Sequence, residues 1–175
     1  MTAPEFSRTV RADSLGVTPH PLALEASAAE RGALARRFGL VAIARLSAAA
    51  VLTRNGDEIR AGGTLAGEVT QSCVASGAPV EAVVNVPFDL VFRPQPEGGG
   101  PDEEVELGEA ELDVIFYDGG AIDLGEAVAE TLLLNLDPYP RAPGAGAALQ
   151  AAGVKSEEEV GPFAALAGLK DKLKP

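Results

Sequence analysis

The chain has 175 residues, of which 46% are apolar and 23% charged, a balance typical of a folded protein and not of a disordered one. Its 14 Lys and Arg against 26 Asp and Glu give a net charge of −12, which argues against broad contact with nucleic acid, DNA included, because such binding needs cations. The single cysteine excludes an internal disulfide, and the absence of a signal-peptide core or of a long apolar run predicts a cytoplasmic protein without membrane contact.

The first predicted element is a short helix that begins after Ser27. Ser27 and Glu30 form a capping box, in which the hydroxyl accepts from an early helix amide and the carboxylate reaches back to the cap. Leu34 and Phe38 are four residues apart and share one face of the helix. Gly39 can adopt the left-handed conformation that ends it.

Residues 40–53 suit either a helix or a strand, because alanines alternate with β-branched side chains. The following Asn55-Gly56 pair is a signal for a type I′ hairpin turn, and the apolar pattern resumes at Ile59. We therefore predict two strands joined by this turn.

Period-two alternation continues beyond the hairpin, and it places Leu65, Val69 and Cys73 on the core side. A longer strand follows whose even positions are apolar from Val80 to Phe92. Burial of one face only is typical of an antiparallel sheet, and Pro87 indicates a bulge or an edge position.

A Pro/Gly-rich and then acidic loop is predicted at 94–111, after which Leu112, Val114 and Phe116 resume strand alternation. Asp118-Gly119-Gly120 then turns the chain into a second main helix. We expect Asp123 to cap this helix, with Glu126 completing a capping-box-like pair, and prolines to end it at Pro138.

The predicted fold class is α+β: an antiparallel β-sheet or a partly closed barrel with two main helices and a flexible C-terminal tail. We expect a single domain over 1–140, which contains the acidic loop at 94–111. Residues 141–175 are expected to be a flexible tail with a short terminal helix.

No catalytic, cofactor or metal site is predicted. A reactive thiol needs an electropositive setting beside a base, and nothing in the sequence positions the lone His20 against Cys73. One Cys and one His also fall short of the four ligands of a structural zinc site. Cys73 is expected to be a buried core residue, so we expect a protein that is not an enzyme.

Two kinds of binding residue are candidates. A basic protein could bind acidic side chains of the loop and apolar side chains near the C-terminus, namely Asp102, Glu103, Glu104, Glu106, Phe163, Leu166 and Leu169. Precursor RNA could instead bind arginines gathered by the fold, namely Arg8, Arg11, Arg31, Arg36 and Arg37.

Three stretches, in the same order, resemble the YceD family of large ribosomal RNA subunit accumulation proteins of bacteria and plastids, in its proteobacterial branch. They are GTLAGEVTQSCVASGAPV, IDLGEAVAETLLLNLDPYPRAP and PFAALAGLK, with an acidic insert between the first two. Many family members carry a Cys-x-x-Cys in the first stretch, whereas Ser76 stands here at the second position. No metal role is therefore implied for this chain.

The resemblance implies a cytoplasmic, non-enzymatic factor needed for large-subunit ribosomal RNA to accumulate. The partner would be a ribosomal protein or a ribosomal RNA precursor of the large subunit. Two alternatives are an acidic protein-binding module without a ribosomal role and a Cys73-dependent hydrolase.

Overall fold

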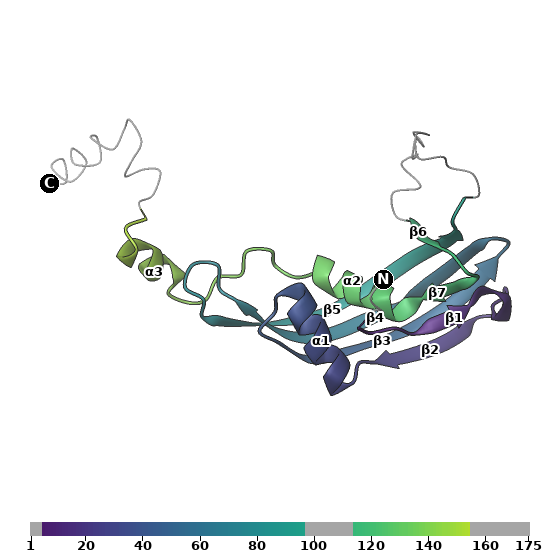
Figure 1. The fold of residues 1–175 in the computed structure, drawn as a ribbon, viewed down its shortest axis with the longest axis horizontal. Helices are drawn as coiled ribbons and strands as arrows, with labels where there is room; N and C mark the ends of the chain where they lie inside the picture. The colour runs from purple at the N-terminus through teal and green to yellow at the C-terminus, as the bar shows by residue number, and fades with distance from the viewer. Residues whose placement is uncertain (1–4, 97–113, 155–175) are drawn as a thin grey trace, which may run out of the picture. The chain divides into compact units, whose positions relative to one another are not determined.

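The computed structural model describes residues 5–96 and 114–154. Within them the chain has an α+β fold of three α-helices and two sheets without a closed barrel, which confirms the predicted fold class and excludes the barrel (Figure 1). The chain forms two compact units. One contains the residues up to Gln71 together with Glu81–Asp137, and the other contains Ser72–Val80 and the chain after Asp137.

The larger sheet has five strands in the order β2-β3-β4-β5-β6. They are β2 (His20–Glu25), β3 (Ala42–Asn55), β4 (Glu58–Ser72), β5 (Pro79–Pro94) and β6 (Val114–Tyr117). β3 and β4 pair antiparallel, as predicted. β2, which the sequence patterns did not predict, pairs antiparallel with β3, whereas β6 pairs with Val91–Pro94 in parallel. A parallel pair needs a connection of about a dozen residues or more, and residues 95–113 provide one.

The predicted hairpin joins β3 to β4, with a different turn from the one expected. Asn55 pairs with Glu58, so the two turn residues are Gly56 and Asp57. Of these two residues, only Gly56 has a positive φ, of 63°. Asp57 does not, because every described residue with a positive φ is a glycine. A positive φ at the first turn position alone fits type II′, whereas type I′ requires one at both positions.

A small second sheet pairs β1 (Thr9–Arg11) with β7 (Ala121–Asp123), and a 3-10 turn (Ala12–Ser14) follows β1. The sequence patterns predicted neither strand. Each has three residues, too few for a period to be visible, and their partners lie more than a hundred positions apart.

Both main helices begin where the capping signals predict, and α1 also ends there, whereas α2 ends at Leu134, before the expected stop at Pro138. α1 (Ala28–Phe38) has the capping box of Ser27 with Glu30 and ends at Gly39, whose φ is 66°. α2 (Leu124–Leu134) is capped by the Asp123 side chain, which accepts from the Glu126 amide. A third helix, α3 (Ala145–Ala151), forms where a flexible tail was expected, since its alanines favour a helix.

The core of the first unit lies between the sheet and the two main helices, which cover one face of it (Figure 1). Leu34 of α1 and Val128 and Leu132 of α2 are fully buried, and so are Leu46 of β3 and Leu65 of β4. The even residues of β5 are more buried than the odd ones from Val80 to Leu90, as the alternation predicted. In the second unit Cys73 is buried, also as predicted.

The exposed edge of β2 offers few backbone groups to another strand. The amide of Ala26 donates to Leu46, so by alternation the odd residues of β2 point their backbone groups away from β3. Among these, Pro21 has no N–H, and the Glu25 carbonyl already accepts from the Arg8 guanidinium. Pro21 and the occupied Glu25 carbonyl therefore reduce the number of backbone groups with which a second strand could pair.

Candidate functional site

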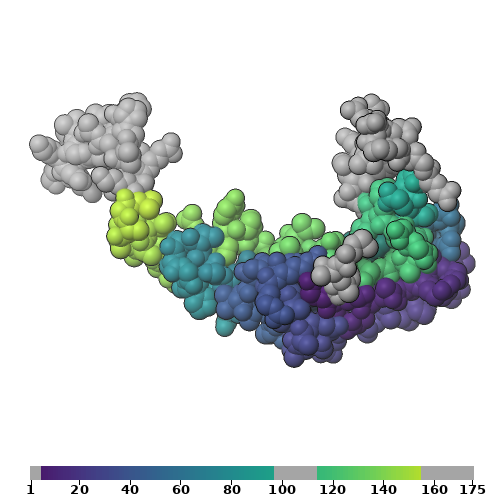
Figure 2. Space-filling model, viewed as in Figure 1, coloured from purple at the N-terminus to yellow at the C-terminus, as the bar shows by residue number. Residues whose placement is uncertain are grey.

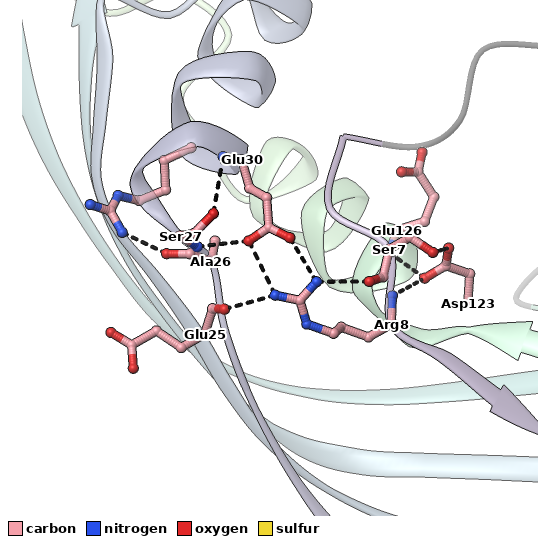
Figure 3. Close-up of polar contacts among 9 residues, drawn as sticks. Ser7, Arg8, Glu25, Ala26, Ser27, Glu30, Asp123 and Glu126 are labelled. Carbon is pink, nitrogen blue, oxygen red and sulfur yellow. Dashed lines mark hydrogen bonds and ion pairs between the residues drawn. The ribbon is translucent and has the colours of Figure 1, made fainter.

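Arg8, a candidate for RNA contact, binds the protein itself (Figure 3). Its guanidinium makes a two-bond ion pair with Glu30, in which Nη1 lies 2.7 Å from Oε1 and Nη2 lies 3.1 Å from Oε2. Nη1 also donates to the Ser7 carbonyl at 2.7 Å, and Nη2 donates to the Glu25 carbonyl at 3.1 Å. The guanidinium stacks 4.6 Å above the ring of Phe6, which is fully buried. Arg8 thus makes the contacts of a structural residue.

The same network binds residues 6–8, which we call the N-terminal segment, to the beginnings of both main helices. Glu30, while bound to Arg8, accepts from the Ser27 amide at 2.7 Å. Asp123 accepts from the Ser7 hydroxyl at 2.5 Å and from the Arg8 amide at 2.8 Å, in addition to capping α2. In the space-filling view the N-terminal segment and α1 lie against each other (Figure 2).

Arg37 of α1 is bound in the same way. Its two terminal nitrogens lie 3.0 and 2.5 Å from the carboxylate oxygens of Glu126 on α2, and Nη1 also reaches Glu5 at 3.0 Å. Glu126 therefore joins the two helices and does not complete the capping box that the sequence predicted. These contacts raise the pKa of Arg37 above its ordinary value, through the hydrogen bond to Glu126 first and then that to Glu5.

The other three arginines differ in how they are bound. Arg11 pairs with Asp13, and both side chains are well exposed. Arg31 donates to the carbonyl of Ala26 at 2.5 Å. Arg36 is exposed and has no hydrogen bond or ion pair to any residue in the two described ranges.

Arg8 and Arg37 do not offer an open basic surface. Around Arg8 and Arg37 lie the carboxylates of Glu5, Glu30, Asp123 and Glu126, so negative charges outnumber positive ones there. A phosphate would have to displace a bound carboxylate from either guanidinium, and it would meet the repulsion of the others.

The acidity of Glu30 provides a test of the network. The Arg8 guanidinium first, and then the Ser27 amide, lower the pKa of Glu30 from 4.5 to about 2. Because the pKa is lower in the folded state, the ion pair stabilises the fold fully above pH 4.5, and this contribution is lost as the pH falls towards about 2.

We expect urea unfolding, followed by circular dichroism, to show wild-type protein losing about 1–2 kcal/mol more stability over this acid range than Glu30→Gln. Glu30→Gln cannot change its charge, so it isolates the contribution of this carboxylate. Parallel pH profiles for the two proteins would contradict a depressed pKa.

The acidic and apolar candidates for partner binding lie outside the described residues. This holds for Asp102, Glu103, Glu104, Glu106, Phe163, Leu166 and Leu169. Their role remains a prediction from the sequence.

Cys73 lies in a tight turn of the second unit, where its amide donates to the Ala78 carbonyl and its own carbonyl accepts from Gly77. Hydrogen bonding from Ser76, and then from the backbone of Ala142, lowers the pKa of the Cys73 thiol to about 7.

In the described ranges there is no group of three or more His, Cys, Asp or Glu side chains that could hold a metal ion. His20, at the start of β2, is exposed and pairs with Leu52.

A hollow of about 640 Å³ lies at the end of the hairpin, and its lining includes Arg11 and Arg54. Arg54 donates to the carbonyls of Ala12 and Gly56, at 2.8 Å each, and Arg11 is paired with Asp13. Arg54 is therefore bound within the protein, and the one well-exposed cation among the described residues of this lining is Arg11, which shares its charge with Asp13.

Fold and charge together define an acidic α+β protein whose bound arginines hold its helices and N-terminal segment together. The chain belongs to the YceD family, because the family model described as "Large ribosomal RNA subunit accumulation protein YceD" matches residues 61–170. The name of the family implies a part in the accumulation of large-subunit ribosomal RNA. Comparisons with curated proteins and with solved structures found no match. No helix in the described part of the chain is long and apolar enough to cross a membrane.

Proposed function

We propose that this protein is a non-enzymatic, cytoplasmic assembly factor of the large ribosomal subunit that binds a basic ribosomal protein and not bare precursor RNA. Membership of the YceD family supports the role in ribosomal RNA accumulation. The choice of a basic protein as partner depends on the charge of the chain and on the state of its arginines.

The observation that carries this choice is the pairing of Arg8 and Arg37 with carboxylates of the protein itself. Binding to RNA requires cations that are free to replace the counterions of phosphate groups. With these two guanidiniums bound and a net charge of −12, the chain is better suited to a positively charged partner. Ribosomal proteins of the large subunit are such partners as a class.

Depletion of the protein from cells should reduce the amount of mature large subunits in a sucrose gradient, and tagged protein in complemented cells should sediment with large-subunit precursors. A normal gradient profile, with the tagged protein only at the top, would contradict the assembly role.

A pull-down at low and at moderate salt separates the two kinds of partner. Ribosomal proteins recovered after nuclease treatment would support direct protein contact. Recovery of precursor RNA without ribosomal proteins would overturn that choice while leaving the assembly role intact.

A further inference from the structure

One side of α2 is largely left open by the core, although Ala127 on that side is buried. Its core side carries Leu124, Val128 and Leu132, all fully buried. Ala127, Glu130, Thr131 and Leu134 are spaced i, i+3, i+4 and i+7, so they share another side of the helix. These four residues line a hollow of about 480 Å³ together with residues of β5 and β6.

A second hollow, of about 330 Å³, continues along the same side of the helix, because Ile115, Ala127 and Glu130 line both. We call the two together the α2 groove, and its main residues are Leu90, Ile115, Phe116, Ala127, Glu130 and Leu134.

The α2 groove exposes an apolar side chain at its margin, because Leu134, at the end of α2, is 84% exposed. Leu90 and Ile115 are half-buried, and both pack against the core. The Thr131 hydroxyl donates to the Ala127 carbonyl at 2.7 Å, so its polar atom is satisfied within the helix. The groove therefore presents a surface that gains stability when apolar side chains cover it.

The charged side chains that line the groove are all acidic. Asp89, Asp118, Asp123, Glu126 and Glu130 line the two hollows, and none of the described lining residues is Lys, Arg or His. Asp123 and Glu126 are bound to groups of the protein, as described above. In contrast, Glu130 and Asp118 have no hydrogen bond or ion pair within residues 5–96 and 114–154, and Asp89 reaches only Arg60, at 3.7 Å. Glu130 and Asp118 are thus the two carboxylates of the rim that keep their negative charge without a partner in the described residues.

We propose that the α2 groove binds a basic amphipathic segment of a ribosomal protein, and this proposal depends on the function proposed above. Apolar side chains of the segment would cover Leu90, Ile115 and Leu134, as when a helix lies in a groove. Its Lys and Arg would pair with Glu130 and Asp118, which favours rapid association and rejects acidic segments. RNA lacks the aliphatic side chains for this surface, and the acidic rim repels its phosphates.

The test uses the full chain and two fluorescent peptides of about 15 residues, both made of Leu and Lys. In one, the leucines are spaced i, i+3, i+4 and i+7. The other has the same composition in a scrambled order. Fluorescence anisotropy should show that the first binds at least about tenfold more tightly than the second. Equal affinity would mean that charge alone causes binding, and it would overturn the groove proposal.

Four variants locate the binding surface. Glu130→Lys and Leu134→Asp should each weaken binding of the first peptide by about tenfold or more. Glu81→Lys is the matched control for charge, since Glu81 is exposed and unpaired within the described ranges. Val83→Asp is the matched control for the apolar residue, because Val83 is 79% exposed. If the groove variants bind as the controls do, the groove is not the site.

Two further outcomes separate the alternatives. The chain's own final residues contain Lys170, Lys172 and Lys174 together with apolar side chains. If the peptide binds only after these lysines are changed to Glu, the chain itself occupies the groove and the proposed partner is wrong. Retained sedimentation of Glu130→Lys and Leu134→Asp with large-subunit precursors would overturn the groove but not the assembly role, which only the depletion experiment tests.

Discussion

Gly63→Ala is expected to lower the free energy of unfolding by about 3 kcal/mol or more, among the largest effects of any single methyl group in this fold. Gly63 lies on the core face of β4, opposite Ala50 of β3. A Cβ atom there would collide with the Ala49 carbonyl oxygen, and it would lie 2.9 Å from both the Ala50 Cα and the Phe88 ring. Backbone atoms of a paired strand cannot move away without breaking the sheet.

Gly62→Ala is the matched control, one residue earlier in the same strand. An added Cβ at Gly62 meets no atom within 4 Å, because this residue faces away from the core. Alanine there should leave stability unchanged or raise it slightly, since it reduces the freedom of the unfolded chain. Urea denaturation of both variants measures the difference. An equal loss in both would show that the cause is not the close approach of β3 and Phe88.

The parts of the fold that follow from neighbouring residues could be predicted from the sequence. The capping box at Ser27, the Asp123 cap and the left-handed Gly39 depend on hydrogen bonds and backbone angles within a few positions, and all three are present. The alternation along β5 is also local, so the sequence correctly predicts which residues of that strand face the core.

Features that depend on distant residues could not be predicted. β1 and β7 are too short to show a pattern, and the parallel pairing of β6 depends on the path of the chain after β5. Glu126 has the spacing of a capping box, but Arg37, 89 positions away, offers a charged partner instead. An ion pair of two bonds is a stronger contact for this carboxylate than one neutral amide.

The candidate site shows the same limit. The sequence could identify clusters of arginine but not their partners, so Arg8 and Arg37 resembled free cations. The α2 groove had one sequence signal, the apolar residues at the end of the helix outside its core stripe. Its other wall comes from β5 and β6, and only the fold brings these beside α2.

Arg8→Ala is expected to destabilise the protein by about 2 kcal/mol, even though Arg8 is partly exposed and solvent weakens its ion pair. The substitution leaves Glu30, whose side chain is only 22% exposed, without its cation. It also removes the donor to the Ser7 and Glu25 carbonyls and uncovers the ring of Phe6. The measurement is urea unfolding at neutral pH.

Arg11→Ala is the control, because Arg11 also pairs with a carboxylate but its side chain is 77% exposed and that of Asp13 is 63% exposed. Solvent screens such a pair, so no measurable loss of stability is expected. The stability of Arg8→Lys should lie between those of wild-type protein and Arg8→Ala, since lysine keeps the charge but cannot form both bonds to Glu30.

If Arg8→Ala and Arg11→Ala are equally stable while both lose precursor RNA in the pull-down, these arginines bind phosphate. The choice of a basic protein as the partner would then be wrong, because its main support is the structural role of Arg8.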